Sequence, residues 1–161
     1  MDRPLFQAAE VLDMAIEIER KGLAFYRGCA VVRANEKVAE LFEYAGEQEQ
    51  RHIEVFTRMK RDLDQYTLPE SYPGETLSYI DGLIGDTAFA TVDEAACAAE
   101  EMSDVGEAIA TAVAMERSSI AFYSGLRDLV RESERAAVDE IIAEEHRHIR
   151  RLLALGHDLQ A

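Results

Sequence analysis

Four stretches of the chain repeat apolar residues at intervals of three and four positions, the spacing that places side chains on one face of an α-helix. They lie at about residues 5–33, 35–63, 104–130 and 133–159. The prolines stand at positions 4, 69 and 73, so none of them interrupts a stretch. The pattern therefore predicts four long helices, with Asn35 and Ser133 suited to cap the second and the fourth.

The links between these helices differ in length. A couple of residues near position 34 join the first pair, and a similarly short link near position 132 joins the second pair, which favours two antiparallel hairpins. Residues 64–103 separate the hairpins and contain two short helix-like pieces, at about 76–85 and 92–102. Two hairpins joined by one long crossover is the connectivity of ferritin-like bundles. We therefore expect an all-α, ferritin-like four-helix bundle that forms a single domain over residues 1–161.

The two predicted hairpins also resemble each other in sequence. The segment Glu-Arg-Lys-Gly-Leu-Ala-Phe-Tyr at 19–26 matches Glu-Arg-Ser-Ser-Ile-Ala-Phe-Tyr at 116–123 at five of eight positions. Further along, Glu-Gln-Arg-His at 49–52 matches Glu-His-Arg-His at 145–148. The offsets are 97 and 96 residues, so the chain has the pattern of a duplicated hairpin with a pseudo-twofold site.

Each apolar seam is interrupted near its middle by ionisable residues. These are Glu19 in the first helix, Glu49 and His52 in the second, Glu116 in the third, and Glu145 and His148 in the fourth. All of them stand about 13 to 17 positions from the turn of their own hairpin. At a rise of ~1.5 Å per residue, that spacing places all six in one layer of the core.

Four buried carboxylates need partners, because each buried ion costs several kcal/mol. No Lys or Arg occupies the seams, so a structural layer of ion pairs is the weaker explanation. Two metal ions held by four Glu and two His would compensate the charge, as in the di-iron carboxylate bundles. Such ligands suit iron or manganese, and zinc could substitute for them.

Two tyrosines accompany this pattern. Tyr26 and Tyr123 each follow a seam glutamate by seven residues, which is two turns along the same helix face. They are either core packing residues or hydrogen-bond donors to the carboxylates, and in the second case they could also take part in redox chemistry.

With its paired Glu-x6-Tyr and Glu-x-x-His motifs and the wording Glu-Arg-x-x-x-Ala-Phe-Tyr, the chain resembles the rubrerythrin-like branch of the ferritin-like superfamily. The resemblance implies that Glu19 and Glu116 are terminal ligands of two iron ions. It implies that the glutamates of the two Glu-x-x-His motifs, 49 and 145, bridge the ions, and that each motif histidine, 52 or 148, is terminal on one of them.

Two departures from that family bear on activity. Rubrerythrins proper carry a rubredoxin domain with two CxxC pairs, and this sequence contains none, so we expect an external electron donor. They also carry a further glutamate three residues after the third-helix ligand, where this chain has Ser119. Peroxidase activity therefore does not follow from the resemblance alone.

Composition narrows the classes of partner. The net charge is −15 without a basic patch, which argues against nucleic acid and anionic membrane surfaces. No apolar run approaches the ~18 residues of a membrane span, and the first residues lack the apolar core of a signal peptide. Cys29 and Cys97 form no CxxC pair and are expected to be buried small apolar residues in a cytoplasmic protein.

Three functions remain open from the sequence. The first is a non-haem di-iron oxidoreductase of peroxidase or ferroxidase type that reacts with peroxide or O₂, with a role in oxidative stress. The second is an iron-binding or sequestering protein with ferroxidase-like activity, and the third is a structural bundle without catalysis. We expect a homo-oligomer, with a dimer favoured.

Overall fold

The computed structural model describes residues 8–29, 31–63, 82 and 88–161. Its elements are α1 (Ala8–Gly28), the 3₁₀ turn η1 (Val31–Ala34), α2 (Glu36–Leu63), α4 (Val92–Glu101), α5 (Val105–Leu129) and α6 (Glu132–Asp158). No strand occurs within these described ranges. None of the described helices combines the length and the apolar character that crossing a membrane requires.

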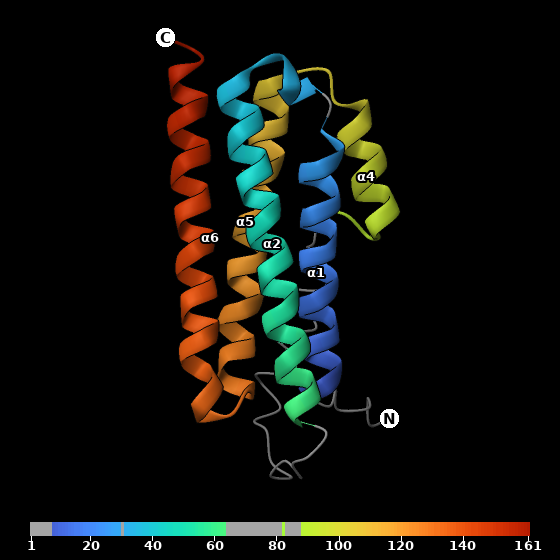
Figure 1. Cartoon of the computed structure of the whole chain (residues 1–161), viewed down its shortest axis with the longest axis vertical. Coiled ribbons are helices and arrows are strands. Elements are labelled where there is room, and N and C mark those ends of the chain that lie inside the picture. The colour runs from blue at the N-terminus through green and yellow to red at the C-terminus, as the bar shows by residue number, and fades with distance from the viewer. Residues whose placement is uncertain (1–7, 30, 64–81, 83–87) are drawn as a thin grey trace.

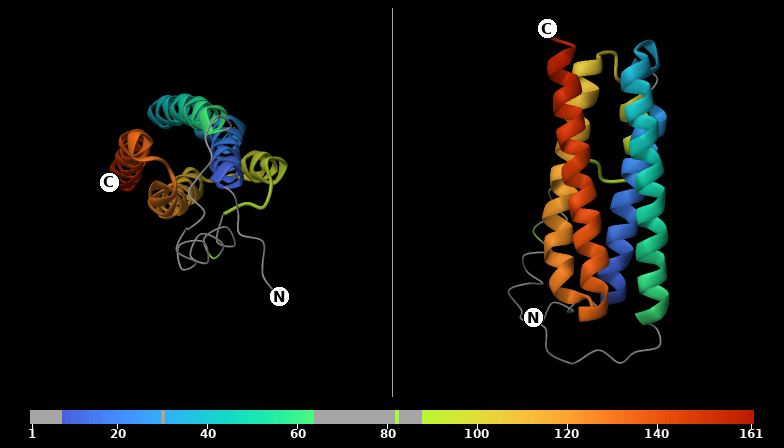
Figure 2. Two further views of the ribbon diagram at one scale, coloured as in Figure 1. Left: turned by 90° about the horizontal axis from the view of Figure 1, so that it is seen from below. Right: turned by 60° about the vertical axis from the view of Figure 1, so that its left-hand side comes forward.

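The four long helices stand side by side with nearly common axes (Figure 1; Figure 2). Helices α1 and α2 form one antiparallel hairpin, and α5 and α6 form the other. Helix α2 ends at one end of the bundle and α5 begins at the other, as expected when a long crossover joins the two hairpins. The prediction of an all-α, ferritin-like four-helix bundle is confirmed.

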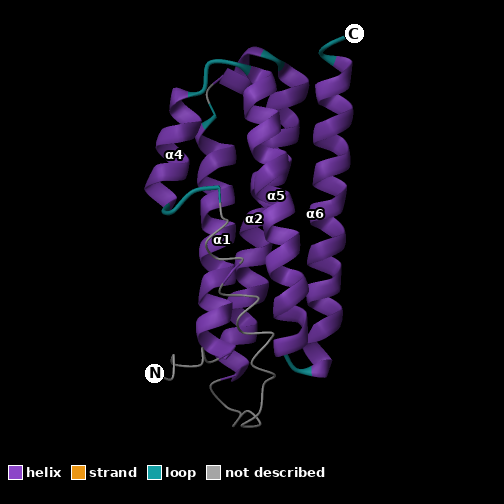
Figure 3. Ribbon diagram, turned by 180° about the vertical axis from the view of Figure 1, so that it is seen from behind, coloured by secondary structure: helices purple, strands orange, loops and turns teal. Residues whose placement is uncertain are grey.

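The crossover contributes one helix to the described structure. Helix α4 lies within the predicted piece at 92–102 and packs along the outer side of α1, away from α6 (Figure 3). The other predicted piece, at 76–85, falls outside the described residues apart from position 82.

The first helix ends earlier than expected. It stops at Gly28, and the chain then turns through η1, so a continuous helix as far as position 33 is wrong. A Cβ atom at Gly28 would lie 3.0 Å from the Cβ of Ala99 and 3.3 Å from the carbonyl oxygen of Ala96, both in α4. Glycine thus permits the close approach of α4, and it is also a weak helix former. The sequence pattern carried no information about this packing.

The two predicted N-caps have different outcomes. The Asn35 side chain accepts a hydrogen bond of 3.3 Å from the Val38 N–H, as an N-cap does at the start of α2. Ser133 does not cap α6, because the helix begins at position 132 and Arg131 occupies the cap position without a side-chain cap bond. The link after α5 is so short that α6 starts before the serine is reached.

The core consists of two apolar clusters, one toward each end of the bundle. The first includes Leu12, Phe56, Leu126 and Val138, and the second includes Phe25, Phe42, Ile109 and Leu152, each set drawn from all four long helices. Between the clusters lies a layer of buried charged residues, which is where the interrupted seams meet.

Candidate metal centre

All six seam residues are brought together in that layer. Side chains from every long helix converge there, and none is more than 4 % exposed to solvent. They are Glu19 from α1, Glu49 and His52 from α2, Glu116 from α5, and Glu145 and His148 from α6. The spacing of three residues within α2 and within α6 puts the Glu and the His of each motif on one helix face.

The cluster divides into two overlapping groups of possible ligand atoms. Glu19 and His52 form one group with Glu49 and Glu145. The second group joins Glu116 and His148 to the same two glutamates, Glu49 and Glu145. Within each group the ligand atoms lie within 4.8 Å of one another, which is compact enough to surround one ion. Two neighbouring ion positions that share two carboxylates follow from this arrangement.

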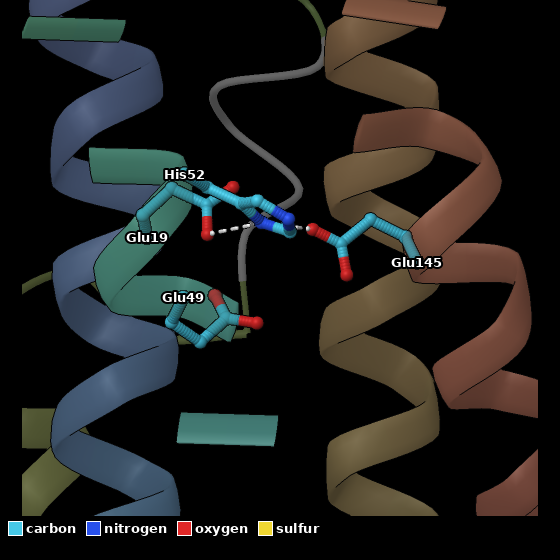
Figure 4. Close-up of side chains that lie close together, drawn as sticks. All are labelled: Glu19, Glu49, His52 and Glu145. Atoms are coloured by element: carbon cyan, nitrogen blue, oxygen red, sulfur yellow. Dashed lines mark hydrogen bonds and ion pairs between the residues drawn. The ribbon is translucent and has the colours of Figure 1, made fainter. Parts of the chain in front are cut away.

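Each histidine turns its Nδ1 atom toward carboxylates. His52 Nδ1 lies 3.3 Å from Glu19 Oε2 and 3.0 Å from Glu145 Oε1 (Figure 4). His148 Nδ1 lies 3.3 Å from Glu116 Oε1 and 3.0 Å from Glu145 Oε2. Glu145 therefore lies between the two imidazoles, whose ring centroids are 6.4 Å apart.

The two tyrosines cross between the hairpins. The Tyr26 hydroxyl on α1 donates a hydrogen bond to Glu116 on α5, and the Tyr123 hydroxyl on α5 donates to Glu19 on α1. Burial, followed by the nearby carboxylates, raises the pKa of both phenols, so both keep the proton that they donate. Both tyrosines thus hold carboxylates of the layer in place.

The carboxylates of the layer do not share one charge state in the metal-free chain. Burial and then the charge of Glu19 raise the pKa of Glu49 well above its usual range. Burial and then Glu145 raise the pKa of Glu116 to about 8. Burial would raise the pKa of Glu145 too, but its contacts with both imidazoles outweigh burial and lower it. Without metal, the raised pKa values favour the protonated form of Glu49 and Glu116, and the lowered pKa favours the ionised form of Glu145.

For the two histidines, burial and the neighbouring carboxylates shift the pKa in opposite directions. Burial alone would lower the pKa of each imidazole, but the adjacent carboxylates outweigh it. Glu19 is the strongest of these for His52 and raises its pKa to about 12. Glu116 and Glu145 raise the pKa of His148 to about 10. Without metal, the raised pKa values favour the imidazolium form of both histidines, which supplies positive charge beside the carboxylates.

Several buried atoms of the layer still lack a hydrogen-bond partner. Among the described residues, both carboxylate oxygens of Glu145, one oxygen of Glu49 and Nδ1 of His148 have none. The short Nδ1-to-carboxylate distances at Glu145 thus lack hydrogen-bond alignment. Buried polar atoms without partners are costly, and carboxylate oxygens and imidazole nitrogens are ligands that divalent metals accept. The donor set fits a pair of metal ions.

Sequence reasoning missed two residues next to the ligands. Glu144 Oε2 lies 2.6 Å from His52 Nε2, the ring nitrogen that faces away from the cluster. Gln48 is 3 % exposed, and its Nε2 has no hydrogen-bond partner in the part of the chain that the structure describes. Both stand just before a motif glutamate, off the apolar seam, so a search along the seams alone could not find them. The available signal was position, since Gln48 and Glu144 correspond in the repeat.

The cysteine prediction was half right. Cys29 is buried, and burial raises the pKa of its thiol to about 12. Cys97 is exposed on α4, so its expected burial is wrong. The helical period brings it to the side of α4 that faces away from α1.

The comparisons with known proteins agree with this geometry. The sequence model described as Rubrerythrin matches residues 10–156, which include all four long helices almost completely. No curated protein and no solved structure matches the chain.

Proposed function

Because the chain belongs to the rubrerythrin family, we propose that its buried cluster binds two iron ions and that the loaded protein reacts with peroxide or O₂, using electrons from an external donor. Zinc or manganese can occupy the same ligands, because metal choice depends on availability as well as on affinity.

The overlap of the two ligand groups is the observation that carries the proposal. Glu49 and Glu145 belong to both groups, which supports bridging roles for them. Glu19 with His52, and Glu116 with His148, each belong to one group, which supports terminal roles. The structural division thus agrees with the roles that the family resemblance implies.

When bound, a pair of iron ions supplies reversible electron transfer at two neighbouring centres, together with ligand positions open to an oxygen-containing substrate. The chain's own residues hold the site in shape. Tyr26 and Tyr123 each donate a hydrogen bond to a terminal carboxylate and so fix its orientation. Glu144 accepts from Nε2 of His52, which leaves Nδ1 directed into the cluster.

A second candidate is an iron-binding or sequestering protein with ferroxidase-like activity. One observation favours it: Ser119 stands where rubrerythrins proper carry a further glutamate, so the chain departs from the pattern that is associated with peroxidase activity. In this case iron would be oxidised once as it is taken up, and an added donor would not sustain turnover.

Anaerobic loading with Fe²⁺ tests both candidates. We expect about two ions per chain, because six ligands in two overlapping groups suit a pair. The loaded protein is then mixed in parallel with hydrogen peroxide and with O₂, with and without a chemical electron donor, and followed by visible absorbance. Repeated turnover with the donor supports the oxidoreductase, and a single oxidation supports the sequestering protein.

Glu116→Ala should lower the iron content, whereas the matched control Glu140→Ala, at an exposed position on α6, should leave it unchanged. No iron bound by the unchanged protein, or iron retained fully by Glu116→Ala, would refute the metal site.

A further inference from the structure

A small cavity lies between α1 and α5 beside the metal layer. Of the six cluster residues, it contacts Glu49 and Glu116, and its volume is about 30 Å³. Gly22 on α1 and Ser119 on α5 also line it, together with the half-buried Phe89 and the exposed Ala88. The cavity therefore connects one side of the cluster with the surface of the bundle.

Two small residues at related positions of the sequence repeat line this space. Gly22 and Ser119 are 97 residues apart, the same offset as Glu19 and Glu116. A Cβ atom at Gly22 would lie 2.6 Å from Oε2 of Glu49, so the carboxylate occupies the room that a side chain would take. The Ser119 hydroxyl donates a 3.1 Å hydrogen bond back to the Met115 carbonyl oxygen, so that its hydrogen is not directed into the cavity.

The cavity meets the cluster on its glutamate side. Glu49 and Glu116, which are 4 % and 3 % exposed, both line it. Both histidines, in contrast, are absent from the lining of the cavity. The side of the cluster lined by Glu49 and Glu116 thus has room for an additional group.

The volume limits what that group can be. A water molecule requires roughly 10–15 Å³ of such space, so the cavity accommodates about two water-sized atoms. Dioxygen and hydrogen peroxide each have two heavy atoms, whereas an aromatic hydroperoxide is far larger. We propose that this cavity, framed by Gly22 and Ser119, is where a two-oxygen oxidant enters and binds, and that its size excludes bulky organic hydroperoxides. This inference rests on the proposed function, because it assumes a metal-loaded cluster.

Filling the cavity is the first test. Ser119→Leu places a larger apolar side chain in it, and Ser119→Ala is the matched control that removes the hydroxyl and leaves the space. The probe is nitric oxide, a diatomic ligand of ferrous iron, mixed anaerobically with the Fe²⁺-loaded protein in a stopped-flow spectrometer. We expect Ser119→Leu to slow nitric oxide binding by about tenfold or more, equal to ~1.4 kcal/mol of added barrier. Ser119→Ala should bind at the rate of the unchanged protein.

A glycine pair tests the same space from α1. Gly22→Ala brings its new methyl against the Glu49 carboxylate and should slow nitric oxide binding. Gly46→Ala makes the same change in α2, where the nearest atoms would lie at an ordinary 3.6 Å, and should have no effect on the rate. Equal rates for the two variants would overturn the assignment.

Widening the entrance gives a test that does not depend on blocking. Phe89→Ala removes the ring that stacks on Phe25 with centroids 5.8 Å apart. We expect this variant to oxidise its iron faster with cumene hydroperoxide, relative to hydrogen peroxide, than the unchanged protein does. Parallel arms with O₂ and with hydrogen peroxide on Ser119→Leu show which of these oxidants uses the cavity.

The outcomes separate this inference from the proposed function. If the unchanged protein binds no iron, the proposed function fails first. If it binds two ions but Ser119→Leu leaves every rate unchanged, the cavity is not the entrance and the metal site stands. If the leucine displaces iron, the Phe89→Ala ratio decides, and an unchanged ratio refutes the inference.

Discussion

Binding of two divalent ions to the metal-free protein at pH 7 should release at least three protons per chain. Three groups of the cluster keep a proton at this pH without metal, because their pKa values are raised to about 8, 12 and 10: Glu116, His52 and His148. The pKa of Glu49 is also raised well above its usual range, so its carboxyl can add to this number. Metal ligands must be deprotonated, so every one of these protons leaves when the ions bind. Proton release makes binding steeply dependent on pH. With three protons released, lowering the pH from 7 to 6 should weaken the overall binding of the pair by about 4 kcal/mol.

Zinc is the suitable ion for the measurement, because it has no redox chemistry that would add or remove protons. Calorimetric titration in two buffers with different ionisation enthalpies gives the number of protons from the difference in heat. Glu116→Gln should lower that number by at least one, since it removes one titrating carboxyl and also a carboxylate that raises the pKa of His148. Glu140→Gln, at an exposed position on α6, is the control and should leave the number unchanged. Release of one proton or fewer would refute the charge state derived for the layer.

Three further predictions concern the same layer. The metal-free protein should lose stability as pH rises from about 5 to 9. The raised pKa values of Glu116 and His148 stabilise the folded state below their ordinary values of 4.5 and 6.5, and this contribution is lost as pH rises toward about 8 and 10. Thermal unfolding with and without zinc measures this, and a flat metal-free curve contradicts it. Glu49→Ala should weaken both ions and Glu19→Ala mainly one, which metal analysis after dialysis would show, and equal effects would argue against a bridging role. Tyr123→Phe should cost about 1–3 kcal/mol in urea unfolding, because it leaves a buried carboxylate oxygen without its donor. Tyr44→Phe, at an exposed tyrosine, should cost little by comparison, and similar losses for the two variants would contradict the hydrogen-bond assignment.

The six cluster residues were visible in the sequence because a polar residue in the middle of an apolar seam conflicts with burial. Glu19 and its counterparts indicated either a structural polar layer or a metal site, and the repeated motif together with seams free of Lys and Arg favoured the metal site. The bundle itself followed from the periodicity and from the lengths of the links. Both arguments use only local spacing, which the sequence contains in full.

Relations across helices could not be read in the same way. The exchange of hydrogen bonds between Tyr26 and Glu116, and between Tyr123 and Glu19, depends on how the two hairpins pack. The absence of Lys and Arg from the seams had indicated carboxylates without counter-ions, yet His52 and His148 supply positive charge when metal is absent. Their charge depends on distances to glutamates of other helices, which no spacing along one helix specifies.

The contact between Glu144 and His52 would make two bound metal ions electrochemically different. A carboxylate on the outer nitrogen makes an imidazole a stronger electron donor to its metal. The related residue in the repeat is the neutral Gln48, so His148 lacks a carboxylate from that position. If the cluster holds iron, as we propose, the ion bound by His52 would have the lower reduction potential. A site built from two similar halves would then contain two ions that differ in how readily each is oxidised.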